Sequence, residues 1–209
     1  MKMFSLGLFF SALLIMTSCS QDQALEEINE TETANLEAAK LGIGSYEVEA
    51  SFLQADSKSA KFNCATTSLV EGLQREMGEI FISSDSRKLY ITFRSDYGFI
   101  IDATNLYVGS MEELPTYSSG NPRVSDFPYR EVHSEGPTSV TYTLPLADFD
   151  PCFYVVAHAV QTRLDVTGTP ILCVNTWAKG APMGGSYNAM VGNFCKTGCT
   201  MEDGPIEVR

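Results

Sequence analysis

The stretch KLYITFRSDYGFIIDATNLYV, residues 88–108, decides the fold class of this chain. In its first half, apolar side chains occupy every second position, which is the pattern of a strand with one solvated face. The residues Asp-Tyr-Gly at 96–98 are a turn signal, and the apolar run after them predicts a second strand over 99–108. The stretch therefore predicts two β-strands joined by a short turn.

The same two-residue period recurs on both sides of this stretch. Residues 46–52 and 139–144 alternate in the same way, whereas 153–160 (FYVVAHAV) is apolar on both sides, as in a strand with both faces covered. Further strands are predicted at 79–83, 171–178 and 187–194. About eight short strands separated by turn signals predict an all-β domain, a single antiparallel β-sandwich over 42–209. Only 67–77 has a weakly helical pattern.

The composition limits the partners that such a domain can have. The 209 residues, 44% of them hydrophobic, suffice for one buried core and are too few for two. The net charge of -12 argues against nucleic-acid binding, because that function needs a basic surface. Residues 21–40 hold six acidic side chains and one lysine, so much of the charge belongs to a leader.

The first 18 residues have the form of an export signal. Lys2 is followed by the apolar stretch 6–16, which is too short to cross roughly 30 Å of hydrocarbon as a helix. Two small residues then precede Cys19, as in bacterial lipoprotein signals, which are cut before a lipid-bearing cysteine. We expect Cys19 to attach the chain to the outer membrane, facing the cell surface or the periplasm, with 19–41 as an acidic tether. Ordinary signal cleavage beside a chance cysteine is the alternative.

Four blocks of the sequence together resemble an uncharacterised domain of secreted and surface proteins of bacteria, Bacteroidetes especially. They are GEIFISSDSRKLYITFRSDYGFIIDATNLYVGS (78–110), GNPRVSDFPYREVHS (120–134), TYTLPLADFDPCFYVVAHAV (141–160) and NTWAKGAPMGGSYNAMVGNF (175–194). The resemblance covers residues 65–195 and keeps the order of the blocks. It implies a β-sandwich displayed outside the cell, and it carries no catalytic residues over to this chain.

With Cys19 assigned to lipid, five cysteines remain, and in an exported chain these predict disulfides. Cys195 and Cys199 are close enough in sequence to pair, whereas Cys64 could instead link the N-terminal strand to the C-terminal one. Cys173 is the thiol that we expect to be left free, buried in a strand as a small hydrophobe. Zinc is not predicted, because no histidine is in register with a second pair of ligands. The disulfide candidates are Cys64, Cys152, Cys195 and Cys199.

No pattern in the sequence predicts a catalytic site, since the chain lacks G-x-S-x-G, H-E-x-x-H and P-loop motifs. His158 lies within an apolar strand and is expected to be a hydrogen-bonded core residue. His133 is expected on a solvated loop beside Glu131. Asp148 and Asp150 are expected to cap a turn. Ca²⁺ binding at this pair is a second interpretation, although Ca²⁺ needs several more oxygen ligands.

Aromatic side chains give the main functional hypothesis. They could form a platform on which sugar rings stack, although a single tryptophan in a β-sandwich is usually part of the core. The candidate ligand-binding residues are Trp177, Tyr129, Phe127 and Tyr187, with Tyr117 on a nearby loop. The sequence thus predicts a non-catalytic envelope lipoprotein without a cofactor, which binds a glycan or an envelope protein.

Two other classes of function stay open at this point. One is a hydrolase or lyase that acts on polysaccharide through His133 or through the Asp148 and Asp150 pair. The other is a structural component of an envelope or filament assembly.

Overall fold

In a computed structural model of the chain, the structure describes residues 45–52, 62–72, 75–183, 186–196 and 200–201. The predicted export signal at 1–18, the tether at 19–41, Cys19 and Cys199 lie outside these residues. Within the described ranges, no helix combines the length and the hydropathy that crossing a membrane requires.

The described residues form antiparallel strands and two short 3-10 helices, so the all-β prediction is confirmed. The 3-10 helices are η1 (Val124–Asp126) and η2 (Leu146–Asp148). The strands are β1 (Glu47–Ser51), β2 (Phe62–Glu71), β3 (Arg75–Ser84), β4 (Lys88–Ser95), β5 (Phe99–Gly109), β6 (Tyr129–Val132), β7 (Ser139–Pro145), β8 (Cys152–Leu164), β9 (Pro170–Ala178), β10 (Ala181–Met183), β11 (Ser186–Cys195) and β12 (Thr200–Met201).

The weak helical prediction for 67–77 is wrong, because β2 and β3 run through this segment and pair with each other. Leu69 and Val70 are neighbours in the sequence and both are fully buried, since β2 is covered on both faces at this point. Two adjacent apolar residues break the two-residue period, and this break explains why the segment resembles a helix in the sequence.

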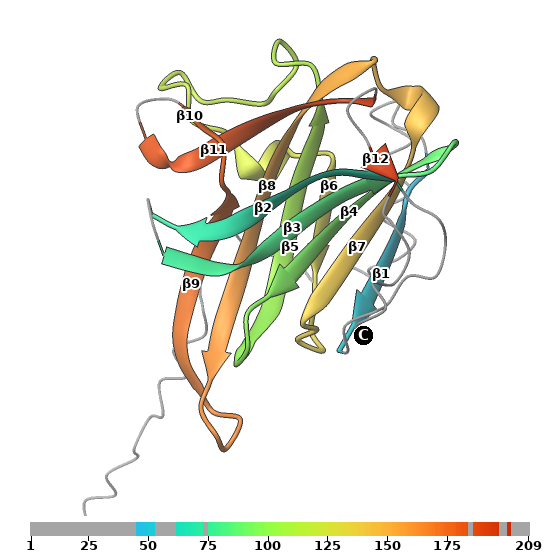
Figure 1. The fold of residues 1–209 in the computed structure, drawn as a ribbon. Coiled ribbons are helices and arrows are strands. Elements are labelled where there is room, and N and C mark those ends of the chain that lie inside the picture. The colour runs from blue at the N-terminus through green and yellow to red at the C-terminus, as the bar shows by residue number, and fades with distance from the viewer. Residues whose placement is uncertain (1–44, 53–61, 73–74, 184–185, 197–199, 202–209) are drawn as a thin grey trace, which may run out of the picture.

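The strands form one curled sheet and not the two facing sheets of a sandwich (Figure 1). From one edge the order is β1-β7-β4-β3-β2-β9-β8, and the far edge of β8 pairs with β5, which pairs with β6. The near edge of β8 is shared, because its first residues pair with β11 and its last residues with β9. The sheet therefore forks beside β8.

The curl brings the two ends of the sheet together around the main core. The ring of Tyr46, just before β1, lies 5.1 Å from the ring of Tyr129 on β6, centroid to centroid. The Tyr46 hydroxyl also donates a hydrogen bond of 3.3 Å to Oε1 of Glu131. These contacts hold the edge formed by β1 against the edge formed by β6, although no ladder of backbone hydrogen bonds joins the two strands.

A second apolar cluster lies on the outer face of the sheet. Segment 110–128, which links β5 to β6, places Leu114 and Phe127 against Trp177, with Val156 of β8 in the same cluster. Inner residues of β8, such as Ala157, belong to the main core instead. The prediction that 153–160 is covered on both faces is thus confirmed.

One disulfide fastens the fork of the sheet. Cys152 at the start of β8 and Cys195 at the end of β11 are opposite each other in the ladder and are bonded. The suggested pairing of Cys195 with Cys199 is therefore wrong. Cys64 and Cys173 are also in disulfides, so the described part of the chain has no free thiol. Cys173 is exposed, because alternate side chains of β9 point outward, and the prediction of a buried free thiol there is wrong.

Candidate ligand-binding face

The predicted aromatic platform is not assembled in this structure. Trp177 and Phe127 are 9% and 3% exposed in the outer cluster, whereas Tyr129, 5% exposed, lies in the main core. Tyr187 lies in β11, but its side chain is outside the described part. Tyr117 on segment 110–128 is 51% exposed, and the Arg123 guanidinium lies 5.9 Å from the centre of its ring. Of the aromatic side chains proposed from the sequence and described here, it alone offers an exposed ring.

His133 lies on the loop after β6, as predicted, but its half-buried side chain points into the curl, so the expectation that it is solvated is wrong. Its Nε2 is 2.8 Å from Oγ1 of Thr104, and that oxygen is 2.7 Å from the hydroxyl of Tyr142. Burial lowers the pKa of His133 to about 4 and raises the pKa of Tyr142. Because Thr104 and Tyr142 are fully buried, this chain of hydrogen bonds ties the half-buried His133 to the core.

The two aspartates of the predicted turn are exposed. Asp148 ends η2 and Asp150 follows two residues later. In the described part of the chain, no three histidine, cysteine or acidic side chains converge on one point that could hold a metal ion. The geometry of this pair therefore offers no support for the Ca²⁺ interpretation.

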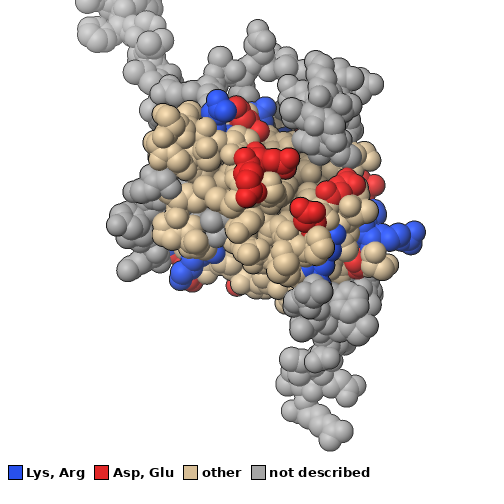
Figure 2. Space-filling model, turned by 90° about the horizontal axis from the view of Figure 1, so that it is seen from above, with Lys and Arg blue, Asp and Glu red and all other residues tan. Residues whose placement is uncertain are grey.

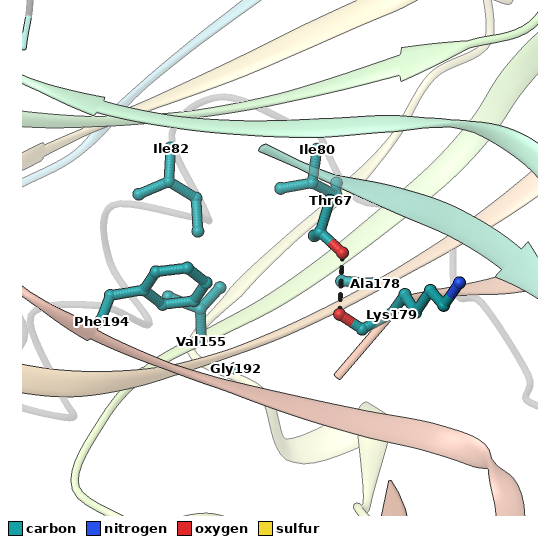
Figure 3. Close-up of a pocket in the computed structure, with 8 residues that line it drawn as sticks. All are labelled: Thr67, Ile80, Ile82, Val155, Ala178, Lys179, Gly192 and Phe194. Carbon is teal, nitrogen blue, oxygen red and sulfur yellow. Dashed lines mark hydrogen bonds between the residues drawn. The ribbon is translucent and has the colours of Figure 1, made fainter. Parts of the chain in front are cut away.

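A small opening lies where the fork separates β2 from β11 (Figure 3). Its walls are apolar, with Ile82, Val155 and Phe194 facing one another, and the Thr67 hydroxyl closes one side by donating to the carbonyl of Lys179. Its volume is about 200 Å³, part of it open to solvent. The space that a water-sized molecule can occupy within it is only about 10 Å³, room for about one water, so this opening is too small for an organic ligand.

A row of polar side chains crosses four neighbouring strands on the outer face of the sheet. Arg130 of β6 is opposite Asn105 of β5, Asn105 is opposite His158 of β8, and His158 is opposite Trp177 of β9. Cross-strand partners point to the same face, so these side chains stand side by side. With Asn175, two residues before the tryptophan, they make up what we name the cross-strand row.

Hydrogen bonds fix the orientation of the two amides in the cross-strand row. The Nδ2 group of Asn105 donates to Nδ1 of His158 at 3.1 Å, and Nε2 of His158 donates to Oδ1 of Asn175 at 3.2 Å. This arrangement requires a neutral imidazole, and burial lowers the pKa of His158 to about 4. These two bonds do not use Oδ1 of Asn105 or Nδ2 of Asn175, which are an acceptor on β5 and a donor on β9 with β8 between them.

His158 is therefore the hydrogen-bonded core residue that the sequence predicts. It is 3% exposed, and its ring lies 4.6 Å from the ring of Trp177. Asn175 and Arg130 at the two ends of the cross-strand row are exposed, and Asn105 is half-buried. The strands between them lie about 4.8 Å apart, so the row spans about 14 Å of the outer face.

Segment 110–128 borders the cross-strand row, since Arg130 donates a hydrogen bond to the carbonyl of Ser125. This segment lies at the upper end of the molecule in Figure 1 and carries the exposed acids Glu112 and Glu113. Seen from that end, acidic side chains gather near the centre of the surface, with lysine and arginine toward its margins (Figure 2). A strongly anionic ligand would be repelled from this end of the molecule.

Sequence reasoning identified His158 and Trp177 but missed the other members of the cross-strand row, which are Asn105, Asn175 and Arg130. Asn105 and Asn175 are polar interruptions within the segments 99–108 and 171–178, each predicted to be a strand, and this is the signal that could have found them. Their alignment across β8 depends on the register of three strands, which the sequence does not reveal. Comparisons with known protein families, with curated proteins and with solved structures find no match to this chain.

Proposed function

We propose that this chain is an exported lipoprotein, held at the outer membrane through Cys19, whose β domain binds a glycan without catalysis. The proposal joins the export and lipid signal of the sequence to one structural observation, which is the cross-strand row. The row would be the ligand site. The resemblance to bacterial surface domains is consistent with this location.

The chemistry of the cross-strand row suits sugar hydroxyls. Each hydroxyl both donates and accepts, and the row offers the acceptor of Asn105 on β5 and the donor of Asn175 on β9, two strands apart. Because His158 holds both amides in place, little side-chain entropy is lost when a ligand binds. The exposed ring of Tyr117 on the bordering segment could cover the apolar face of a sugar.

A shallow outer face favours a polymer over a small molecule. Among the described residues, the polar row lies on the surface of the sheet and not in an enclosed pocket, and the opening at the fork is small and apolar. An extended chain of sugars can bridge the 14 Å or so between the exposed ends of the row, Arg130 on β6 and Asn175 on β9, while His158 between them stays buried.

The test is binding of the full exported chain to an array of bacterial and host glycans. Asn175→Ala and Arg130→Ala should each abolish retention, since both side chains are exposed. Asn175→Ala also removes the acceptor of the buried His158, so circular dichroism must show that each variant is folded. Asn193→Ala is the matched control, because Asn193 is an exposed strand asparagine on β11 outside the cross-strand row. Binding that survives Asn175→Ala, or that Asn193→Ala removes equally, would overturn the assignment of the site.

The anchor is tested separately by fractionation of cells. The wild-type chain should sediment with the outer membrane, and Cys19→Ala should release it into a soluble fraction. A Cys19→Ala variant that stays in the membrane fraction would contradict lipid attachment at this residue.

A further inference from the structure

Two hairpin tips at the lower end of the molecule each present a fully exposed apolar side chain. Tyr97, in the turn between β4 and β5, is 104% exposed, and Val166, in the turn between β8 and β9, is 105% exposed. Both turns lie at the end of the sheet opposite segment 110–128 (Figure 1). Ile171, near the second turn on β9, is a further exposed apolar residue at 55%.

The two turns are neighbours, and the β8–β9 turn projects further from the sheet than the β4–β5 turn (Figure 1). The backbone N–H of Leu164 donates to the carbonyl of Gly98 at 3.0 Å, so the first turn touches the base of the second. Phe99 and Arg163 are cross-strand partners at the same point, with the guanidinium 6.0 Å from the centre of the phenylalanine ring. The spacing of the tips is therefore set by the ladder between β5 and β8.

Each tip is closed by hydrogen bonds within the turn. In the second turn, Oδ1 of Asp165 accepts from the N–H groups of Thr167 and Thr169, at 2.8 and 2.9 Å. In the first turn, the hydroxyl of Ser95 donates to the carbonyl of Phe99 at 2.8 Å. Turns that satisfy much of their own backbone can enter a medium poor in water at a lower cost than open loops.

We propose that these tips rest in the surface of the membrane that holds the lipid anchor, with Tyr97 and Val166 inserted at the level of the headgroups. This inference rests on the anchoring in the proposed function. A bilayer accepts single projecting side chains without a matching pocket, and tyrosine is enriched at this depth. The acidic end with segment 110–128 then faces away from the lipids.

Because the lipid anchor already holds the chain at the membrane, contact through two side chains is enough to orient the domain. Residues 20–45 separate Cys19 from Tyr46, and 26 residues reach at most about 90 Å at roughly 3.5 Å each. The chain enters β1 at the upper end of the sheet, where Glu47 is opposite Thr143, so the tether has to extend back along the domain, and its maximum length is enough for this. Tethering raises the local concentration of the tips at the membrane, so two apolar side chains can hold an orientation that they could not hold in free solution.

The charges around the tips define which lipids they should prefer. Asp96 and Asp165 flank the two apolar residues, with Arg163 between the turns. Asp165 keeps its charge, because hydrogen bonds from Thr167 and Thr169 lower the pKa of its carboxyl. Docking should therefore be stronger on phosphatidylcholine vesicles than on vesicles rich in anionic lipid, since like charges repel.

The experiment uses the full lipidated chain in phosphatidylcholine vesicles whose acyl chains are brominated near the headgroup. Tyr97→Trp and Val166→Trp each add a tryptophan at a tip, while the native Trp177 is buried and gives a constant background. The added emission should shift to the blue and be quenched by the brominated lipid. Tyr117→Trp, an exposed aromatic position at the acidic end, is the matched control and should show neither change.

The outcomes separate the tips from the anchor. Protein that fails to float with the vesicles in a density gradient refutes the anchor, and the tip docking with it. Protein that floats while the tryptophan at 97 or 166 stays unquenched refutes the tip docking alone and leaves the proposed function standing. A blue shift without quenching would also refute it, because it would mean that another protein chain covers the tips.

Discussion

Acid should weaken the fold in a way that depends on His158. This imidazole is neutral and buried, with Asn105 donating to Nδ1 and Asn175 accepting from Nε2. Its pKa is about 4 in the folded chain and about 6.5 once unfolded. As the pH falls, the unfolded chain therefore binds a proton at His158 before the folded chain does. The contribution of neutral His158 to the free energy of unfolding is complete above pH 6.5 and declines between pH 6.5 and 4.

The size of the effect follows from these two pKa values. At pH 5, protonation of the unfolded chain lowers the free energy of unfolding by about 2 kcal/mol relative to pH 7 for this one histidine. His158→Gln keeps an amide that can hydrogen-bond but does not titrate in this range. From pH 7 to pH 5, the free energy of unfolding of His158→Gln should therefore fall by about 2 kcal/mol less than that of the wild type.

Urea denaturation of the oxidised protein at pH 7 and pH 5, followed by circular dichroism, measures this difference. His133 has a lowered pKa as well, but it is present in both proteins and cancels in the comparison. Equal losses in the wild type and in His158→Gln would refute the reasoning. A resonance of the His158 ring that titrates near pH 6.5 would refute it equally.

Two further predictions concern the backbone and the disulfide. Gly78→Ala should lower the melting temperature, because Gly78 has a φ of 149° and its added Cβ would overlap the carbonyl oxygen of Arg94. Gly72→Ala, with a φ of 62° and no atom within 4 Å, should cost only about 1 kcal/mol of backbone strain, and equal melting temperatures would contradict the clash. Replacing both Cys152 and Cys195 by serine should lower the free energy of unfolding by about 4 kcal/mol, from the loop entropy of their separation of 43 residues. A urea midpoint unchanged by that double substitution would contradict the entropic argument.

The sequence predicted the strands well because the period that marks them is local. Each segment with clear alternation, such as 88–94 and 139–144, lies in a strand. The short strand β6 was missed, since four residues between a proline-rich segment and a turn give too little pattern to recognise. The helical interpretation of 67–77 failed because β2 is covered on both faces.

The curl, the fork and the cross-strand row could not be predicted from the sequence, for a different reason. They depend on pairings between residues far apart in the chain, such as Asn105 with His158. The aromatic ring of Trp177 suggested a ligand-binding residue in the sequence. In the structure this ring is buried, because segment 110–128 packs Leu114 and Phe127 against it. A local pattern shows that a residue faces one side of a strand, but not what covers that side.

The order of strands in the sheet also determines when the chain can fold during its synthesis. The first strand pairs with β7, where Glu47 is opposite Thr143, and β2 pairs with β9, where Val70 is opposite Trp177. Such distant pairings form slowly, because a long loop must close before any contact rewards it. The N-terminal half therefore cannot complete its core until most of the chain has been made. For the exported lipoprotein that we propose, this delay would keep the chain unfolded until it has been transported.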